Sequence, residues 1–263
     1  MILQYCSDLH LEFSQNEAYI KAHPIQPIGD ILILAGDITL FTRIDYQKDF
    51  FNYVSDHFKD FFNYVSDHFK ETYWIPGNHE YYQSDISNRS GSFEEKIRNN
   101  VYLVNNVVKN FGANQLIFST LWSSISLLNG WRIERGLNDF YQISYNGKRF
   151  QIPDYNDFHE NCLTFLRDAL EADTKGKKVV ITHHLPTFKH YPPEYKSDYL
   201  NEAFATVLDD LILDTTPDYW IYGHHHRNIP EFKIGHTKML TNQLGYVQQN
   251  ENLFFNSDKC IEL

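Results

Sequence analysis

The sequence predicts an α/β fold, because short apolar runs typical of buried strands alternate with stretches of helical periodicity. Five of these runs are bounded by polar or turn residues, as expected of strands covered on both faces. They are Ile2–Cys6, Ile31–Ala35, Tyr73–Ile75, Val179–Thr182 and Tyr219–Tyr222. Strands that alternate with helices in this way indicate a layered domain.

Helices are predicted where apolar residues recur every three or four positions. This pattern is clearest from Leu200 to Ile212, and it repeats from Phe158 to Leu170. A short helix is also expected where Ser92 and Glu95 resemble a capping box, and it would end near Asn99.

Further short strands favour a second, more antiparallel sheet, with Gly235 and His236 in one of its turns. These strands are expected at Leu116–Trp122, around Phe150, and at Phe232–Ile234, Met239–Thr241 and Leu253–Phe255. No linker rich in Pro, Gly or Ser divides the chain, so we expect a single domain over residues 1–263.

An internal repeat lies between the second and third apolar runs, where Asp49–Lys59 recurs unchanged as Asp60–Lys70. Eleven residues at about 100° each turn close to three whole turns, so the copy lengthens a helix by about 16 Å and keeps its buried face. Phe50, Val54 and Phe58 then continue as Phe61, Val65 and Phe69. The helix either tolerates a duplication that stays in register, or exposes an aromatic stripe that joins the chain to another copy as a homo-oligomer.

Composition excludes some classes of protein. With 23 Lys and Arg against 34 Asp and Glu, the formal charge of -11 argues against binding to nucleic acid or membrane through a basic field. Three widely separated cysteines do not form a disulfide framework, and no apolar run approaches the roughly 20 residues of a membrane helix. No secretion signal is visible, so we expect a cytoplasmic protein. Thirteen histidines indicate that any buried metal would be held by imidazole and carboxylate.

Residue types that bind metals follow each of the five apolar runs directly. The five segments are Asp8-Leu9-His10, Gly36-Asp37, Gly77-Asn78-His79, His183-His184 and Gly223-His224-His225-His226. Ligand sites in α/β proteins form at the carboxyl ends of strands. Each segment alone is a weak signal that a loop cap or a structural histidine would also explain, but five after five strands indicate a metal site.

The order of these motifs resembles the calcineurin-like metallophosphoesterase superfamily from Ser7 to Arg227. The segments Ser7–Phe13 and Thr182–Pro186 and the pair Gly245-Tyr246 are similar to small bacterial and phage-type members of unassigned substrate. The resemblance implies a two-layer mixed β-sandwich flanked by helices, with two metal ions in loops at one edge of the sheets. The implied reaction is hydrolysis of a phosphate mono- or diester by direct attack of a metal-bound hydroxide.

The resemblance also implies a ligand set. Asp37 would bridge the two ions, since a carboxylate has two oxygens to offer. Asp8, His10 and His226 would complete the coordination of one ion, and Asn78, His183 and His224 that of the other. Mixed nitrogen and oxygen ligands suit Mn, Fe, Zn or Co, so the identity of the ions stays open.

His79 is similar to the catalytic histidine of the family, which protonates the leaving alkoxide or stabilises the transferring phosphoryl group, although a hydrogen-bonded loop histidine is the alternative. Glu80 is expected to anchor its loop. Arg43 and Arg227 could reach a phosphate or pair with surface carboxylates. His225 is expected to point away from the ions, and the role of His184 stays open.

The leading hypothesis is therefore a dinuclear phosphoesterase that acts on a small phosphate ester. A nuclease acting on DNA or RNA is less favoured because the chain is acidic. The third hypothesis is an inactive binding module on the same fold, which loss of ligands would mark. Several aromatic side chains could stack on a leaving group or belong to the core: Tyr81, Tyr82, Trp122, Trp131 and Tyr141.

Overall fold

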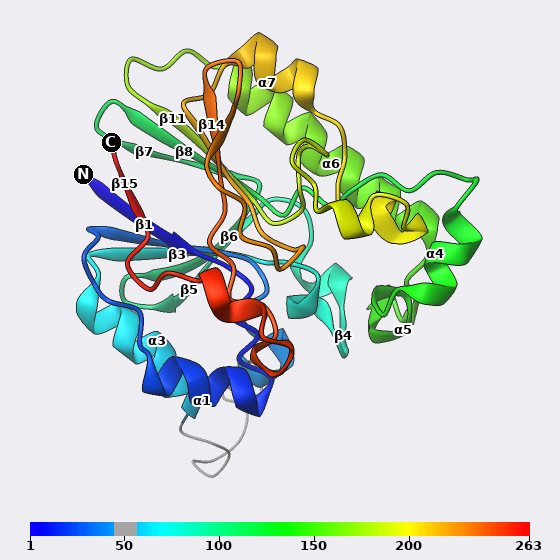
Figure 1. Cartoon of the computed structure of the whole chain (residues 1–263), viewed down its shortest axis with the longest axis horizontal. Coiled ribbons are helices and arrows are strands. Elements are labelled where there is room, and N and C mark those ends of the chain that lie inside the picture. The colour runs from blue at the N-terminus through cyan, green and yellow to red at the C-terminus, as the bar shows by residue number, and fades with distance from the viewer. Residues whose placement is uncertain (45–56) are drawn as a thin grey trace.

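The computed structural model describes residues 1–44 and 57–263, with only the backbone of residues 57–60. Two six-stranded sheets pack face to face, and helices cover both outer faces (Figure 1). This arrangement confirms the predicted α/β fold, a mixed two-layer β-sandwich flanked by helices. None of the described helices is long and apolar enough to cross a membrane.

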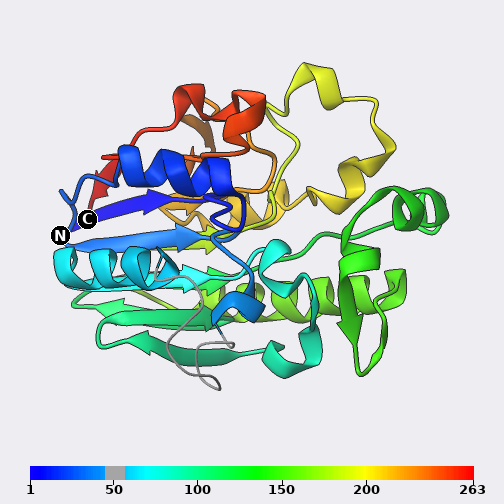
Figure 2. The same cartoon turned by 90° about the horizontal axis from the view of Figure 1, so that it is seen from below.

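The first sheet has the strand order β15-β1-β2-β3-β6-β5. Its four central strands are parallel: β1 (Ile2–Cys6), β2 (Ile31–Ala35), β3 (Glu71–Ile75) and β6 (Val101–Asn105). The two edge strands, β5 (Phe93–Arg98) and β15 (Cys260–Glu262), are antiparallel to their neighbours. Strands β1 and β15 lie side by side (Figure 2).

The second sheet has the order β13-β14-β12-β11-β8-β7. Its central strands are again parallel: β8 (Asn114–Ser119), β11 (Lys178–Thr182), β12 (Tyr219–Ile221) and β14 (Thr237–Leu240). Antiparallel pairing occurs only where the edge strands β7 (Val107–Phe111) and β13 (Phe232–Ile234) join by short hairpins. A smaller sheet consists of β4 (Ser84–Asp85), β9 (Ile143–Tyr145) and β10 (Lys148–Arg149).

The helices complete four layers. Helices α1 (Ser14–Ala22) and α3 (His57–His68) cover the first sheet, while α6 (Ile152–Glu171) and α7 (Asp209–Thr215) cover the second. Two short helices, α4 (Gly130–Gly136) and α5 (Asp139–Gln142), stand at one end of the sandwich. Single 3₁₀ turns occupy His79–Tyr81, Ile86–Arg89, Pro193–Tyr195, Tyr199–Ala203, Val247–Gln249 and Glu251–Phe254.

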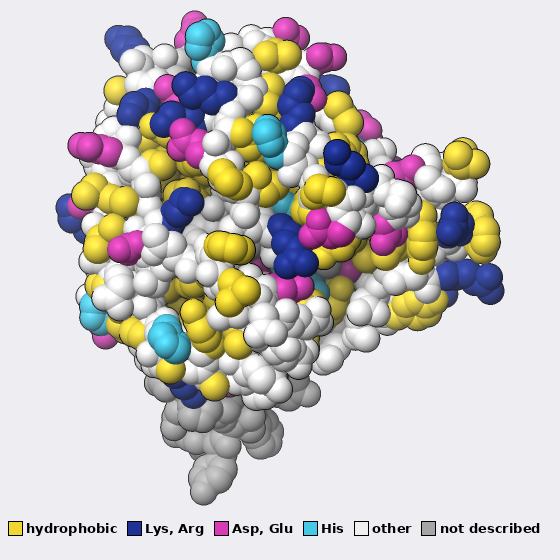
Figure 3. Space-filling model, viewed as in Figure 1, with side chains coloured by type: hydrophobic (Ala, Val, Ile, Leu, Met, Phe, Trp, Pro, Cys, Tyr) yellow, Lys and Arg dark blue, Asp and Glu magenta, His cyan; other side chains and the backbone are white. Residues whose placement is uncertain are grey.

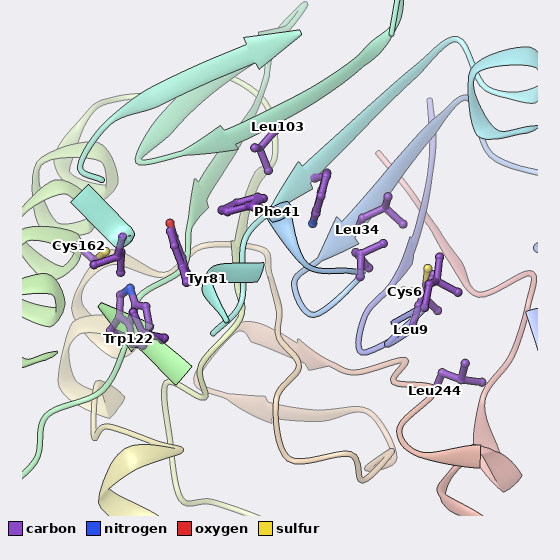
Figure 4. Close-up of a cluster of buried hydrophobic side chains, with 14 of the residues drawn as sticks. Cys6, Leu9, Leu34, Phe41, Tyr81, Leu103, Trp122, Cys162 and Leu244 are labelled. Carbon is purple, nitrogen blue, oxygen red and sulfur yellow. The ribbon is translucent and has the colours of Figure 1, made fainter. Parts of the chain in front are cut away.

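The core follows from the alternation of side chains along the strands. Leu3, Ile33 and Ile75 of the first sheet meet Phe118 and Ile181 of the second. The opposite faces of the same strands pack under the helices, in clusters that hold the outer layers in place. In Figure 4, the cluster on the first sheet extends from Leu34 and Leu103 to Tyr81 and Trp122.

Three predictions of secondary structure were wrong where tertiary contacts override local pattern. The segment after Ser92 is strand β5, because it pairs with β6, and Glu95 forms an ion pair with Arg89 at 2.9 Å. The predicted helix from Leu200 to Ile212 is broken by a β-bridge between Leu185 and Ala205, so only α7 is helical beyond it. Leu253–Phe255 is not a strand, and Phe254 is 78% exposed in a 3₁₀ turn.

The second sheet is also not more antiparallel than the first, because each has three parallel and two antiparallel pairs. The other strands and the helix from Phe158 to Leu170 were predicted correctly. Phe61, Val65 and Phe69 of the second repeat copy are buried, as the helical register requires. Most of the first copy, including Phe50 and Val54, lies outside the described residues, so the lengthened helix and the homo-oligomer remain predictions.

Candidate metal centre

The loops that leave five parallel strands carry the predicted ligands, and they meet at one edge of the sandwich. Asp8, His10, His224 and His226 all have left-handed backbone angles, with φ of 56°, 45°, 78° and 51°, and Asp37 has φ of 54°. Such angles are uncommon outside glycine and concentrate at functional sites. The tight turns bring the side chains back over the ends of the strands.

One set of ligand atoms comes from Asp8, His10, Asp37 and His226, which lie within 4.8 Å of one another. The Nε2 atoms of His10 and His226 are 2.9 Å apart. His226 Nε2 is 3.4 Å from Asp8 Oδ1, and His10 Nε2 is 3.7 Å from Asp37 Oδ2. Four donor atoms therefore face a common point.

A second set comes from Asp37, His183 and His224, again within 4.8 Å. His183 Nε2 is 3.2 Å from His224 Nδ1 and 3.4 Å from Asp37 Oδ1. Asn78, which precedes His79, has a buried Oδ1 without a hydrogen-bond partner among the described residues, while its Nδ2 donates to Asp139 at 2.8 Å. Asp37 thus contacts the two sets through different oxygens.

The residues fit metal ions on chemical grounds. The facing Nε2 atoms of His10 and His226 are 2.9 Å apart, so both can turn a lone pair towards one ion once the proton between them is released. Asn78 Oδ1 is a further buried oxygen, without a hydrogen-bond partner among the described residues. Mixed nitrogen and oxygen donors suit Mn, Fe, Co or Zn.

The electrostatics of the cluster depend on carboxylates close to imidazoles. Burial acts to raise the pKa of Asp37, but His183 and His79 hold it well below its usual range. Burial lowers the pKa of His226, yet hydrogen bonds to Asp8 and Glu251 outweigh it and raise the pKa to about 10. Burial is likewise outweighed at His183, where Asp37 raises the pKa to about 9. The carboxylates beside these two rings therefore favour their protonated forms.

Each histidine of the two sets is also fixed through its other ring nitrogen, as is usual for metal ligands. His10 Nδ1 lies 3.0 Å from Glu12 Oε1, and His226 Nδ1 lies 2.8 Å from Glu251 Oε2. Backbone carbonyls face the other two, Ala35 at 2.9 Å from His183 Nδ1 and Ala203 at 3.4 Å from His224 Nε2.

Glu80 anchors the loops, as expected. Its Oε2 accepts hydrogen bonds from the backbone N–H groups of Asp37 and Gly77 at 3.0 and 2.7 Å. Its Oε1 accepts from Ile38 N–H at 2.7 Å and from Trp74 Nε1 at 3.0 Å. One buried carboxylate thus ties the loop after β2 to the loop after β3.

Glycine is required where these loops cross. A Cβ atom on Gly77 would stand 2.2 Å from Asp37 Oδ1 and 2.6 Å from His183 Nε2. The backbone therefore passes directly against the two ligand sets.

His79 stands beside the ligand sets with its ring stacked on Tyr82, at 4.2 Å between centroids. Its Nδ1 is 2.9 Å from Glu12 Oε1, and its backbone N–H donates to Asp37 Oδ1 at 3.0 Å. Burial acts to lower the pKa of His79, but Asp37 and Glu12 raise it above the usual value. Burial acts to raise the pKa of Glu12, but His10 and His79 lower it to about 2, so Glu12 is an ionised acceptor.

The remaining histidines and arginines lie outside the ligand sets. His184 is buried with Nε2 3.2 Å from Tyr155 Oη, and His225 packs near Tyr191 and Tyr222 with Nδ1 2.9 Å from Gln243 Nε2. Arg43 donates to the Glu12 carbonyl at 2.7 Å. Arg227 lies 3.4 Å from Glu194, the surface pairing that was its alternative role.

A cavity of about 340 Å³ opens beside the centre. Its walls come from the end of α4, from the segment between Tyr191 and Phe204, and from His79, His224 and His226. Of the aromatic residues considered for stacking, only Tyr82 lines it. Tyr81 and Trp122 are buried in the core (Figure 4), and Trp131 and Tyr141 are exposed elsewhere.

Sequence reasoning missed the acidic residues behind the ligands. The position of Glu12 could have been recognised in the sequence, because Asp8, His10 and Glu12 lie at every second residue. Asp139 and Glu251 could not have been recognised in this way, because they reach the centre from distant segments.

Comparison with known proteins identifies the family of the chain. Residues 5–228 match the family described as calcineurin-like phosphoesterase, so the chain belongs to that family of metallophosphoesterases. Its sequence is 31% identical over 281 residues to "Uncharacterized protein L509" of Acanthamoeba polyphaga mimivirus, covering 95% of this chain and 93% of that protein. Its fold is similar to that of a phosphopantetheinyl hydrolase from Mycobacterium tuberculosis, with a TM-score of 0.69 and 16% identity over 98% of this chain and 95% of the other.

Proposed function

We propose that the protein is a dinuclear metal-dependent phosphoesterase that hydrolyses a small phosphate mono- or diester. The observation that carries the proposal is the carboxylate of Asp37, which faces one ligand set through Oδ2 and the other through Oδ1. Asp8, His10 and His226 would hold one ion with Asp37, and Asn78, His183 and His224 the other.

Two ions bound there would neutralise the phosphoryl oxygens and lower the pKa of a water that attacks phosphorus. The chain itself contributes orientation and a proton. His79 borders the cavity with Nε2 on the side of Tyr246 Oη, 3.4 Å away. As the bond between phosphorus and the leaving oxygen breaks, its electron pair goes to that oxygen and His79 Nε2 donates the proton.

The cavity supports a small substrate over a polynucleotide. Its volume of about 340 Å³ is at the lower end for ligand pockets. Among the described residues that line it there is no Lys or Arg, whereas five are Tyr or Phe. On the face in Figure 3, acidic and basic side chains are interspersed and form no continuous basic track. A nuclease would need cations along the phosphate backbone.

The proposal is tested by metal analysis and a substrate panel. Protein purified without added metal is analysed for bound elements and assayed with Mn²⁺ on phosphomonoesters, phosphodiesters, cyclic nucleotides, a phosphopantetheinyl ester and single-stranded DNA. We expect about two ions per chain and turnover of a small ester. Asp37→Asn should lose both properties, whereas Asp168→Asn, an equal change of charge on the exposed side of α6, should lose neither.

Each alternative hypothesis has its own outcome. Cleavage of DNA with a steep dependence on salt would favour the nuclease. Absence of bound metal together with no turnover would favour the binding module.

A further inference from the structure

A single carboxylate oxygen lies within hydrogen-bond distance of both His79 and His10. Glu12 Oε1 lies 2.9 Å from His79 Nδ1 and 3.0 Å from His10 Nδ1. The Glu12 side chain is only 6% exposed, and its other oxygen is buried without a hydrogen-bond partner in the described part of the chain. Glu12 does not line the cavity, so any effect on substrate must pass through these rings.

The hydrogen bond decides which nitrogen of His79 faces the cavity. An ionised carboxylate only accepts, so Nδ1 of His79 must be the N–H donor, and Nε2 is the atom that points to the other side. The remaining contacts of His79 leave this choice open. Stacking on Tyr82 does not distinguish the two ring nitrogens, and the bond to Asp37 comes from the backbone. Tyr246 Oη lies 3.4 Å from Nε2, but a hydroxyl can donate or accept and so does not select a tautomer.

We propose that Glu12 is a positioning residue that holds the His79 ring with Nε2 towards the leaving-group oxygen. The inference rests on the proposed function, in which His79 donates the proton to that oxygen. Without Glu12 the ring can flip and place Nδ1 or carbon at the reacting position. The proton transfer is then lost, while the ions and the attacking water remain.

Two esters that differ in the leaving group separate this role from a structural one. A 4-nitrophenyl ester leaves without protonation, whereas the corresponding alkyl ester needs a proton. With Mn²⁺ at saturation, we expect Glu12→Ala to lower kcat for the alkyl ester about 100-fold more than for the nitrophenyl ester, within the range of general acid catalysis. Glu17→Ala, which removes an acidic residue that contacts Lys21 on α1, is the matched control and should leave the ratio unchanged.

His79→Ala should show the same selective loss, and the double variant should lose no more than either single variant, because both act through one group. The tautomer of His79 gives a readout apart from activity. Nitrogen NMR of the metal-free full chain, recorded at a pH where the ring is neutral, should find the proton on Nδ1 in the wild type and a mixture of tautomers in Glu12→Ala. If Glu12→Ala does not fold, Glu12→Gln, which keeps one acceptor oxygen for two donors, should give an intermediate loss.

Equal losses on both esters, additive losses in the double variant, or an unchanged His79 tautomer would overturn the inference. A wild-type protein that binds metal but hydrolyses neither ester would instead overturn the proposed function. Elemental analysis of each variant shows whether the contact of Glu12 with His10 matters for metal content.

Discussion

Replacing Asp139 by Asn tests whether the second ion depends on a residue that contacts its ligand Asn78 but supplies no ligand atom itself. Asp139 Oδ1 accepts hydrogen bonds from Asn78 Nδ2 at 2.8 Å and from Tyr82 Oη at 2.7 Å. The first of these bonds fixes the amide so that Nδ2 is engaged and Oδ1 is the atom left without a hydrogen-bond partner among the described residues. With a neutral amide at position 139, the Asn78 side chain can turn over and present its NH₂ group to the ion.

The size of the effect follows from the charge of the acceptor. A hydrogen bond to a buried charged group is worth about 1.5–3 kcal/mol, and one between neutral groups about 0.5–1.5 kcal/mol. The difference of about 1–1.5 kcal/mol corresponds to roughly tenfold weaker binding of the ion held by Asn78. This agrees with the roughly 10- to 100-fold losses that follow changes behind metal ligands.

The assay is competition for Mn²⁺ between the metal-free protein and a chromophoric chelator, which resolves the two binding steps. Tyr82→Phe is the control, because it removes the other bond to the same oxygen, together with a longer contact of 3.3 Å between Asn78 Nδ2 and Tyr82 Oη, and keeps both Asp139 and the stacking on His79. It should change either affinity less than threefold. If Asp139→Asn binds both ions as the wild type does while Asn78→Ala loses one, then Asp139 does not orient the amide.

Three further predictions concern the loops and the charge of the centre. Gly77→Ala should abolish metal binding, because the added Cβ would lie 2.2 Å from Asp37 Oδ1. Gly130→Ala is the control and should keep metal binding, because no atom lies nearer than 3.7 Å to its added Cβ. Equal metal binding by the two variants would contradict the geometry. The pKa values of about 9 at His183 and about 10 at His226 mean that both rings are protonated at pH 8 without metal. Binding of metal should therefore release about two protons, and the affinity for metal should increase as pH rises towards 9. Calorimetry in buffers of different ionisation enthalpy measures this release, and an affinity independent of pH would refute it. Glu80→Gln places an NH₂ group against two N–H donors, so the free energy of unfolding of the metal-free protein should fall by about 1–3 kcal/mol and its Tm by several degrees. An unchanged Tm would show that the four hydrogen bonds to Glu80 do not stabilise the fold.

The sequence was sufficient for the parts of the centre that follow strands directly. Strand ends are marked locally, by an apolar run and the polar residue after it, so Asp8, Asp37 and His183 could be placed at one edge before the sheets were known. The resemblance then supplied their grouping, and the structure brings Asp8, His10 and His226 to one side of Asp37, and His183 and His224 to the other.

The parts that escaped prediction depend on contacts between distant segments. Asp139 reaches Asn78 across 61 positions of the chain, and no local pattern encodes such a distance. The segment at Phe93 has the capping signal of a helix but pairs with β6, because a sheet edge offers it a full set of backbone hydrogen bonds. Hydrophobic spacing from Leu200 likewise could not reveal a bridge to Leu185.

The left-handed turns at the centre have a consequence for how the chain can change. Asp8, His10, Asp37, His224 and His226 each occupy a conformation that glycine adopts without strain and that costs other residues about 1 kcal/mol or more. Selection for stability alone would therefore replace these side chains with glycine or asparagine. Their presence at five such positions means that the metal-free fold is less stable than this backbone allows, and that random substitutions which stabilise it should accumulate at the centre and remove the activity.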